Sequence, residues 1–213
     1  MKFSPLFALS ALIAVAPVAF AQSTTDITVT GTITPAACTP SIGGGGNFNF
    51  GTIAAQDLRQ DVPTGFMSSL RPLSVVCDAP TRFALHAVDG RAGTDTEPHE
   101  ESFGLGLNGT EKIGMYALRT TDYIADGNAS TKLVESFNGG NTWVDYGSDA
   151  AYIPNTIQPR LIGVSVDAGS EPSAIGVLAA NLQVVMYINA AKDLTLTDEV
   201  PIDGASTLEV VYL

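Results

Sequence analysis

The sequence has 213 residues with a net charge of −12 at neutral pH, 15% charged residues and 21 glycines. An acidic chain repels nucleic acid and anionic lipid, so neither is expected as a partner. Few charges and many glycines favour turns and closely packed strands over surface helices.

The first residues predict export. Lys2 precedes an apolar run over residues 6–20 that Pro17 interrupts, and Ala19-Phe20-Ala21 forms a small-x-small cleavage site. This pattern predicts a secretory signal peptide over residues 1–21. The run is too short for a comfortable membrane anchor, and we expect no integral membrane segment after cleavage. No repeat or linker divides residues 22–213, which are expected to form a single domain.

Alternation of side chains predicts strands at both ends of the mature chain. Residues 26–34 place four residues on one face, namely Ile27, Val29, Gly31 and Ile33. Residues 206–213 place Leu208, Val210 and Tyr212 on one face. An apolar strand at a chain end invites pairing with another strand.

Between the two ends, similar patterns predict further strands at residues 47–53, 72–77, 82–88, 112–120, 160–166 and 181–191. Residues 138–146 predict a Gly-Gly turn followed by a short strand. The strongest helix signal, at residues 54–61, is short enough to be one turn. Many short strands joined by Gly-, Asn- and Asp-rich turns predict an all-β fold, a β-sandwich.

The two cysteines, Cys38 and Cys77, predict one disulfide, because an exported chain meets oxidising conditions. Closing a loop of about 40 residues would stabilise the fold by roughly 3–4 kcal/mol. A metal site is the alternative, but two isolated cysteines lack further spaced ligands.

Candidate catalytic and metal-binding groups are sparse in the sequence. There is no G-x-S-x-G nucleophile motif. His86 lies within a predicted strand, where a structural or surface role is expected. His99 lies in the acidic stretch 93–102, which lacks the ligand spacing of a calcium loop and is expected to be a solvated loop. We therefore expect no enzyme activity, no metal and no cofactor; a carbohydrate-active sandwich would need paired carboxylates that the sequence does not identify.

Several motifs resemble those of chaperone–usher pilins: GTITPAACTP (31–40), CDAP (77–80) and LEVVYL (208–213). The chain more closely resembles a pilin-like bacterial family, domain of unknown function 1120. That resemblance is carried by GTITPAAC, CDAPT, DGRAG, FGLG, KIG and LEVVYL, in this order along the chain. It implies an immunoglobulin-like, pilin-type β-sandwich that lacks its last strand.

The resemblance also implies a function: an exported fimbrial subunit, assembled by β-strand donation and acting in cell-surface adhesion. Ile27, Val29, Gly31 and Ile33 would be the donor-strand positions, and Leu208, Val210 and Tyr212 would lie on the strand that pairs with a chaperone or donor. The implied partners are a periplasmic chaperone, an usher and neighbouring subunits, and the implied location is the periplasm followed by the cell surface. The alternative is a self-contained monomeric periplasmic or secreted binding module whose own strands close both edges.

Overall fold

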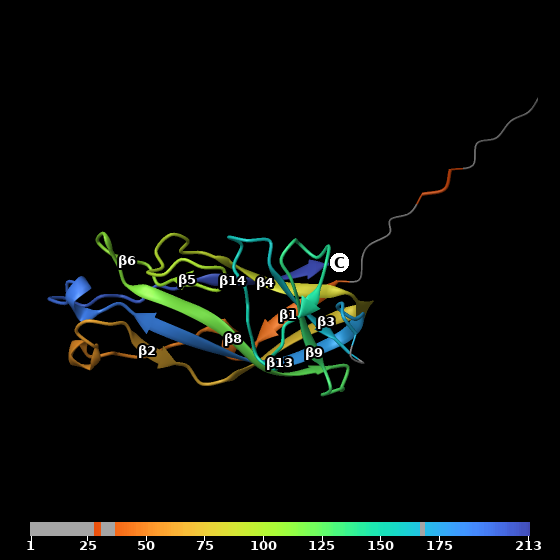
Figure 1. Ribbon diagram of the computed structural model, residues 1–213, viewed down its shortest axis with the longest axis horizontal. Helices are drawn as coiled ribbons and strands as arrows, with labels where there is room; N and C mark the ends of the chain where they lie inside the picture. The colour runs from red at the N-terminus through yellow and green to blue at the C-terminus, as the bar shows by residue number, and fades with distance from the viewer. Residues whose placement is uncertain (1–27, 31–36, 167–168) are drawn as a thin grey trace, which may run out of the picture. The chain divides into compact units, whose positions relative to one another are not determined.

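The two longest strands, β8 (Gly114–Ala125) and β13 (Ile175–Ile188), lie side by side at the centre of the fold (Figure 1). The computed structural model describes residues 28–30, 37–166 and 169–213. Along β13 every second side chain from Leu178 to Ile188 is buried, as expected for a strand with one face on the core.

The described strands form two large antiparallel sheets and one small hairpin. The larger sheet has the order β1 (Cys38–Ile42), β3 (Arg71–Thr81), β13, β8, β11 (Ala151–Tyr152), with β2 (Thr64–Met67) paired to β13 and β5 (Phe103–Gly104) paired to β8. The smaller sheet has the order β10 (Val144–Asp145), β9 (Lys132–Ser136), β12 (Leu161–Ser165), β4 (Phe83–Asp89), β14 (Ser206–Tyr212). The hairpin joins β6 (Leu107–Asn108) to β7 (Glu111–Lys112).

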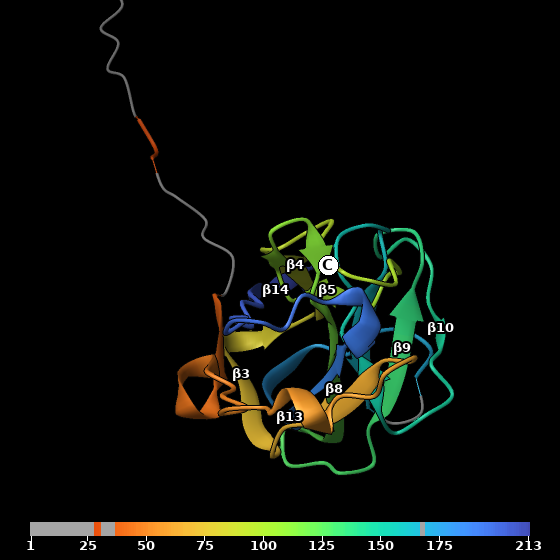
Figure 2. The same ribbon diagram turned by 90° about the vertical axis from the view of Figure 1, so that its left-hand side faces the viewer.

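The two sheets enclose one apolar core. Figure 2 shows β4 and β14 in one layer and β3 and β13 in the other. Phe103 and Tyr116 stack within this core with ring centroids 5.3 Å apart. The predicted all-β class and β-sandwich are therefore confirmed, and the helical elements among the described residues are short 3-10 turns, η1 (Gly43–Gly46), η2 (Ala55–Asp57) and η3 (Ala191–Asp193).

The predicted disulfide is also confirmed. Cys38 and Cys77 are bonded to each other and stand opposite one another in the β1–β3 register. The bond fastens β1, an outermost strand of the larger sheet, to its only strand partner among the described residues.

Most predicted strands are found, but the strand predicted at residues 47–53 is wrong. This segment is extended and pairs with no strand among the described residues. Gly51 has a φ of +66°, and its N–H donates to the Asn49 side chain at 2.7 Å. This turn ends the alternation, so that Ile53 packs against the core like Phe48 and Phe50. The helix signal at residues 54–61 corresponds only to η2.

The chain divides into two units, with the boundary between residues 34 and 35, and the described residues of the larger, carboxyl-terminal unit hold all the strands named above. In the amino-terminal unit the structure describes only residues 28–30, which are exposed and belong to no strand. The predicted signal peptide lies outside the described residues. None of the helices in the described part of the chain is long and apolar enough to cross a membrane.

Candidate functional site

The two sheets each leave one strand edge free on the same side of the sandwich. β1 pairs only with β3, and β14 pairs only with β4, among the strands that the structure describes. The backbone N–H of Cys38 on β1 donates to the Tyr212 hydroxyl on β14 at 2.8 Å. This bond brings the ends of the two edge strands together across the gap between the sheets.

The backbone of β14 directs alternate groups toward this gap. Leu213 N–H donates to Arg82 on the β4 side, and Gly90 N–H donates to Ala205. In an antiparallel pair the bonded positions alternate, so the odd-numbered residues of β14 bond to β4. Ser206, Leu208, Val210 and Tyr212 therefore present their N–H and C=O groups at the free edge.

The same rule places the free backbone groups of β1. Asp78 N–H donates to the carbonyl of Ala37, so Cys38, Pro40 and Ile42 direct their backbone away from β3. Pro40 has no N–H, which is the usual condition for proline within an edge strand. The β14 edge consequently offers a more complete set of hydrogen-bonding groups than the β1 edge.

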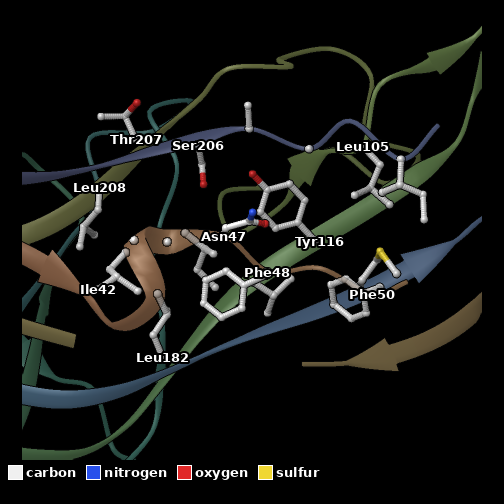
Figure 3. Close-up of a pocket in the computed structure, with 18 of the residues that line it drawn as sticks. Ile42, Asn47, Phe48, Phe50, Leu105, Tyr116, Leu182, Ser206, Thr207 and Leu208 are labelled. Atoms are coloured by element: carbon white, nitrogen blue, oxygen red, sulfur yellow. The ribbon is translucent and has the colours of Figure 1, made fainter. Parts of the chain in front are cut away.

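A groove of about 720 Å³ lies between these two edges (Figure 3). Its lining comes from β1, residues 45–50 and residues 202–208, above side chains of the core. Those core side chains are buried. Tyr116 and Leu118 belong to β8, and Leu105 precedes it; the others belong to β13, namely Leu182, Val184 and Met186. The floor of the groove is thus mainly apolar, and the groove is bordered by strand edges that lack partners in the described chain.

A second cavity of about 1050 Å³ continues the groove. It runs from residues 47–53 to residues 194–202 and shares Asn47, Phe48, Phe50 and Ile202 with the first cavity. The hollow on this side therefore extends beyond β14, with polar as well as apolar side chains along it.

Tyr116 is the polar side chain in the floor of the groove. It is 5% exposed, and Figure 3 shows its hydroxyl on the side of Ser206. Burial raises the pKa of Tyr116 to about 12, and a hydrogen bond with Ser206 acts in the opposite direction. The hydroxyl is therefore neutral at any physiological pH.

We expect this tyrosine to make the fold less stable above pH 10. The unfolded chain loses the phenolic proton near pH 10, whereas the folded chain keeps it to about pH 12, so the folded state binds more protons in this window. Stability is unaffected below pH 10 and falls by about 1 kcal/mol per pH unit between pH 10 and 12. Urea unfolding at pH 9 and pH 11 should show a smaller loss for Tyr116→Phe than for the native chain; parallel losses would contradict the assignment.

The strand predicted at the carboxyl end is β14, which borders this groove, but the three residues named on it differ in burial. Leu208 and Val210 are partly buried and pack against the core. Tyr212 is 48% exposed, and only its hydroxyl reaches β1. On the outer face, His86 Nε2 of β4 lies 2.8 Å from Glu209 Oε2, a cross-strand contact that fastens β14 to its neighbour.

The donor-strand positions are largely beyond what the structure describes. Ile27, Gly31 and Ile33 lie outside the described residues. Val29 is described, is 92% exposed and belongs to no strand. Its side chain is therefore accessible to another molecule.

The acidic stretch 93–102 is solvated only in part: Glu97 and His99 are exposed, as expected for a solvated loop, but Asp95 is not. Asp95 is 3% exposed and accepts a hydrogen bond from Ser102 at 2.8 Å. Glu100 and Glu101 both pair with Arg160, at 3.1 and 2.6 Å. Charges that appear clustered in the sequence are thus separated by their contacts, and the part of the chain that the structure describes holds no group of three possible metal ligands.

Arg160 is an unexpected centre of charge in the fold. Its side chain is 10% exposed and pairs with Glu135 at 2.8 Å as well as with the two loop glutamates. Its guanidinium also lies 5.3 Å from the centre of the Phe137 ring. Desolvation opposes the charge, but the hydrogen bonds and charges of Glu135 and Glu101 outweigh it and raise the pKa of Arg160. The cluster fastens the 93–102 loop to the smaller sheet.

Part of the sequence matches the model of a known family. Residues 27–132 match the family described as protein of unknown function (DUF1120). The DUF1120 match covers the GTITPAAC, CDAPT, DGRAG, FGLG and KIG motifs and ends before the strand β14. The predicted similarity to DUF1120 is therefore confirmed over this part of the chain.

Two proteins of Escherichia coli K12 are similar along most of the chain. The uncharacterized protein YhcF is 27% identical over 98% of this chain and 98% of its own length. Protein GltF is 26% identical over 89% of this chain and 88% of its own length. The similarity to both relatives extends beyond the segment matched by DUF1120.

Proposed function

We propose that the protein is an exported fimbrial or pilin-like structural subunit, assembled by β-strand addition and acting in adhesion at the cell surface. The observation that carries this proposal is the apolar groove between β1 and β14. Its borders are strand edges whose backbone groups point into it, and such edges are natural sites for strand addition.

The donated strand would come from residues 27–33 of a second copy. Their alternation presents Ile27, Val29, Gly31 and Ile33 on one face, which suits an apolar groove floor, and threonines on the other face. The exposed Val29 leaves this segment accessible for such pairing. The donated backbone would bond to β14, because Pro40 weakens the opposite edge.

Before assembly, a periplasmic chaperone would supply a temporary strand at the same edge, and an usher would guide the exchange. The proposal assigns the protein no catalytic activity and no cofactor. Its location would be the periplasm and then the cell surface.

A second candidate function is a self-contained periplasmic or secreted binding module. The observation that favours it is the burial of the groove floor within the single chain: Leu182 is 3% exposed and Met186 is 1% exposed. A module of this kind would be a stable monomer and would need no chaperone.

The two candidates differ in the behaviour of the purified, exported chain. Strand donation predicts self-association in size-exclusion chromatography with light scattering, and deletion of residues 22–30 should abolish it. A stable monomer of the mature mass would contradict strand donation, as would polymers formed by the truncated chain.

A pair of point variants provides a matched control. Val29→Asp places a charge on the predicted donor face and should reduce self-association at least about tenfold, because a buried unpaired charge is costly. Thr28→Asp adds the same charge on the opposite face and should have little effect. Equal effects of the two variants would exclude a specific role for the donor face.

A further inference from the structure

The segment of residues 47–50 occupies part of the candidate groove. Phe48 and Phe50 are partly buried and pack against the core. Figure 3 shows them following one another along the groove, with Leu182 and Tyr116 near Phe48. Both phenylalanines line three neighbouring cavities, two along the groove and a third of about 340 Å³ toward Phe66 and Arg71.

This segment is held by side chains rather than by a backbone ladder. Residues 47–53 belong to no strand, and among the described residues their main-chain contacts are turns: Asn47 N–H to Gly44 at 3.5 Å and Gly51 N–H to the Asn49 side chain. An extended segment without ladder bonds opens more readily than a strand within a sheet.

Glycines stand on both sides of the two phenylalanines. Gly44, Gly45 and Gly46 precede them and Gly51 follows them, all with φ between 66° and 75°. Residues that carry a side chain rarely adopt this backbone conformation, whereas glycine adopts it without strain. The flanking backbone can therefore change direction at little steric cost.

Arg71 on β3 is the main polar attachment of the segment. Its guanidinium lies 5.0 Å from the centre of the Phe48 ring and donates to the Gly43 carbonyl at 3.2 Å. Its Nε is buried and has no hydrogen-bond partner among the residues that the structure describes. The attachment thus leaves a buried donor unsatisfied, which makes the arrangement less stable than a fully bonded one.

We propose that Phe48 and Phe50 occupy the sites that apolar side chains of an added strand would take, so that strand addition displaces an internal occupant. This inference rests on the proposed function. It specifies the partner as an extended segment with large apolar side chains two positions apart, as Phe48 and Phe50 are. The cavity beside Phe66 is also lined by both phenylalanines and offers space toward which the rings can move.

A cysteine reporter in the groove floor tests this internal occupancy. Met186 lines the groove and is 1% exposed, so Met186→Cys should react slowly with a thiol reagent. Adding Phe48→Ala and Phe50→Ala should raise the alkylation rate at least about tenfold, whereas Phe137→Ala, a loss of the same ring from an exposed site, should not. An unchanged rate would overturn the inference.

A second reporter separates local opening from unfolding. Val164 is 4% exposed on the smaller sheet and lines none of these cavities. The alkylation rate of Val164→Cys should therefore stay low in the Phe48→Ala/Phe50→Ala background. Equal acceleration at both reporters would contradict a local occupant. If the double variant yields no folded protein, Arg71→Met should accelerate the groove reporter about threefold while leaving the Val164 reporter unchanged; no acceleration would overturn the inference.

A labelled peptide with the sequence of residues 22–34 distinguishes failure of this inference from failure of the proposed function. Fluorescence anisotropy should show association about tenfold faster for the Phe48→Ala/Phe50→Ala chain than for the native chain. Equal association rates would overturn displacement. If Met186→Cys reacts faster in the double alanine background but neither protein binds the peptide, donation by residues 27–33 is contradicted and the internal occupancy stands.

Discussion

Replacing Cys38 and Cys77 together by serine is expected to lower the free energy of unfolding by about 3–4 kcal/mol. The bond joins residues 39 positions apart, and a covalent link over such a loop restricts the unfolded chain strongly. Urea unfolding of the double serine variant and of the native chain measures the difference directly.

The effect should have a local part as well, because the bond fastens an edge strand. β1 has only β3 as a strand partner in the described chain, so its loss of protection in hydrogen exchange should exceed that of β8 or β13. Reducing the native disulfide is the matched control and should reproduce the serine variant. A loss of unfolding free energy below about 1 kcal/mol would show that pairing with β3 alone holds β1 in place.

The second large effect is expected from Arg160→Met, which should cost about 3 kcal/mol of unfolding free energy. Arg160 is largely buried and faces three glutamates, of which Glu135 is 12% exposed. Removing the cation leaves the nearly buried charge of Glu135 and the partly buried charge of Glu101 without compensation, and this loss is larger than the net value of the ion pairs. Thermal and urea unfolding measure the cost.

Two controls identify the cause of this loss. Arg82→Met removes an arginine whose pair with Glu171 is about half exposed, and it should cost less than about 1 kcal/mol. Neutralising Glu100, Glu101 and Glu135 to glutamine should restore much of the stability of Arg160→Met. Similar costs for the two arginines, or no recovery by the glutamines, would contradict a buried-charge explanation.

Local patterns in the sequence were sufficient for the strands that alternate cleanly. The stretch 82–88 became β4, in which the alternating residues Phe83, Leu85 and Ala87 are buried. The stretch 206–213 became β14, since its alternation agrees with a strand on the core. The disulfide followed from the cysteine count and the predicted export.

Long-range partners decide the features that the sequence did not predict. The alternation at residues 47–53 is strand-like, but the segment pairs with no strand among the described residues, and Gly51 turns it. The Arg160 cluster joins residues 25 to 60 positions apart, so composition alone suggested a solvated acidic loop. For the groove, sequence predicted the β14 side, whereas Phe48 and Phe50 gave only a strand signal and were not predicted to line it.

The register of β14 also bears on mechanical load. β14 runs antiparallel to β4 over seven residue pairs, from Ser206 opposite Asp89 to Tyr212 opposite Phe83. Under the proposed function, tension on a donated strand would act along the strand axes. The bonds of the ladder would then be strained together, and the force a polymer withstands would depend on how fast this whole ladder breaks. The disulfide lies between β1 and β3 and would not share that load.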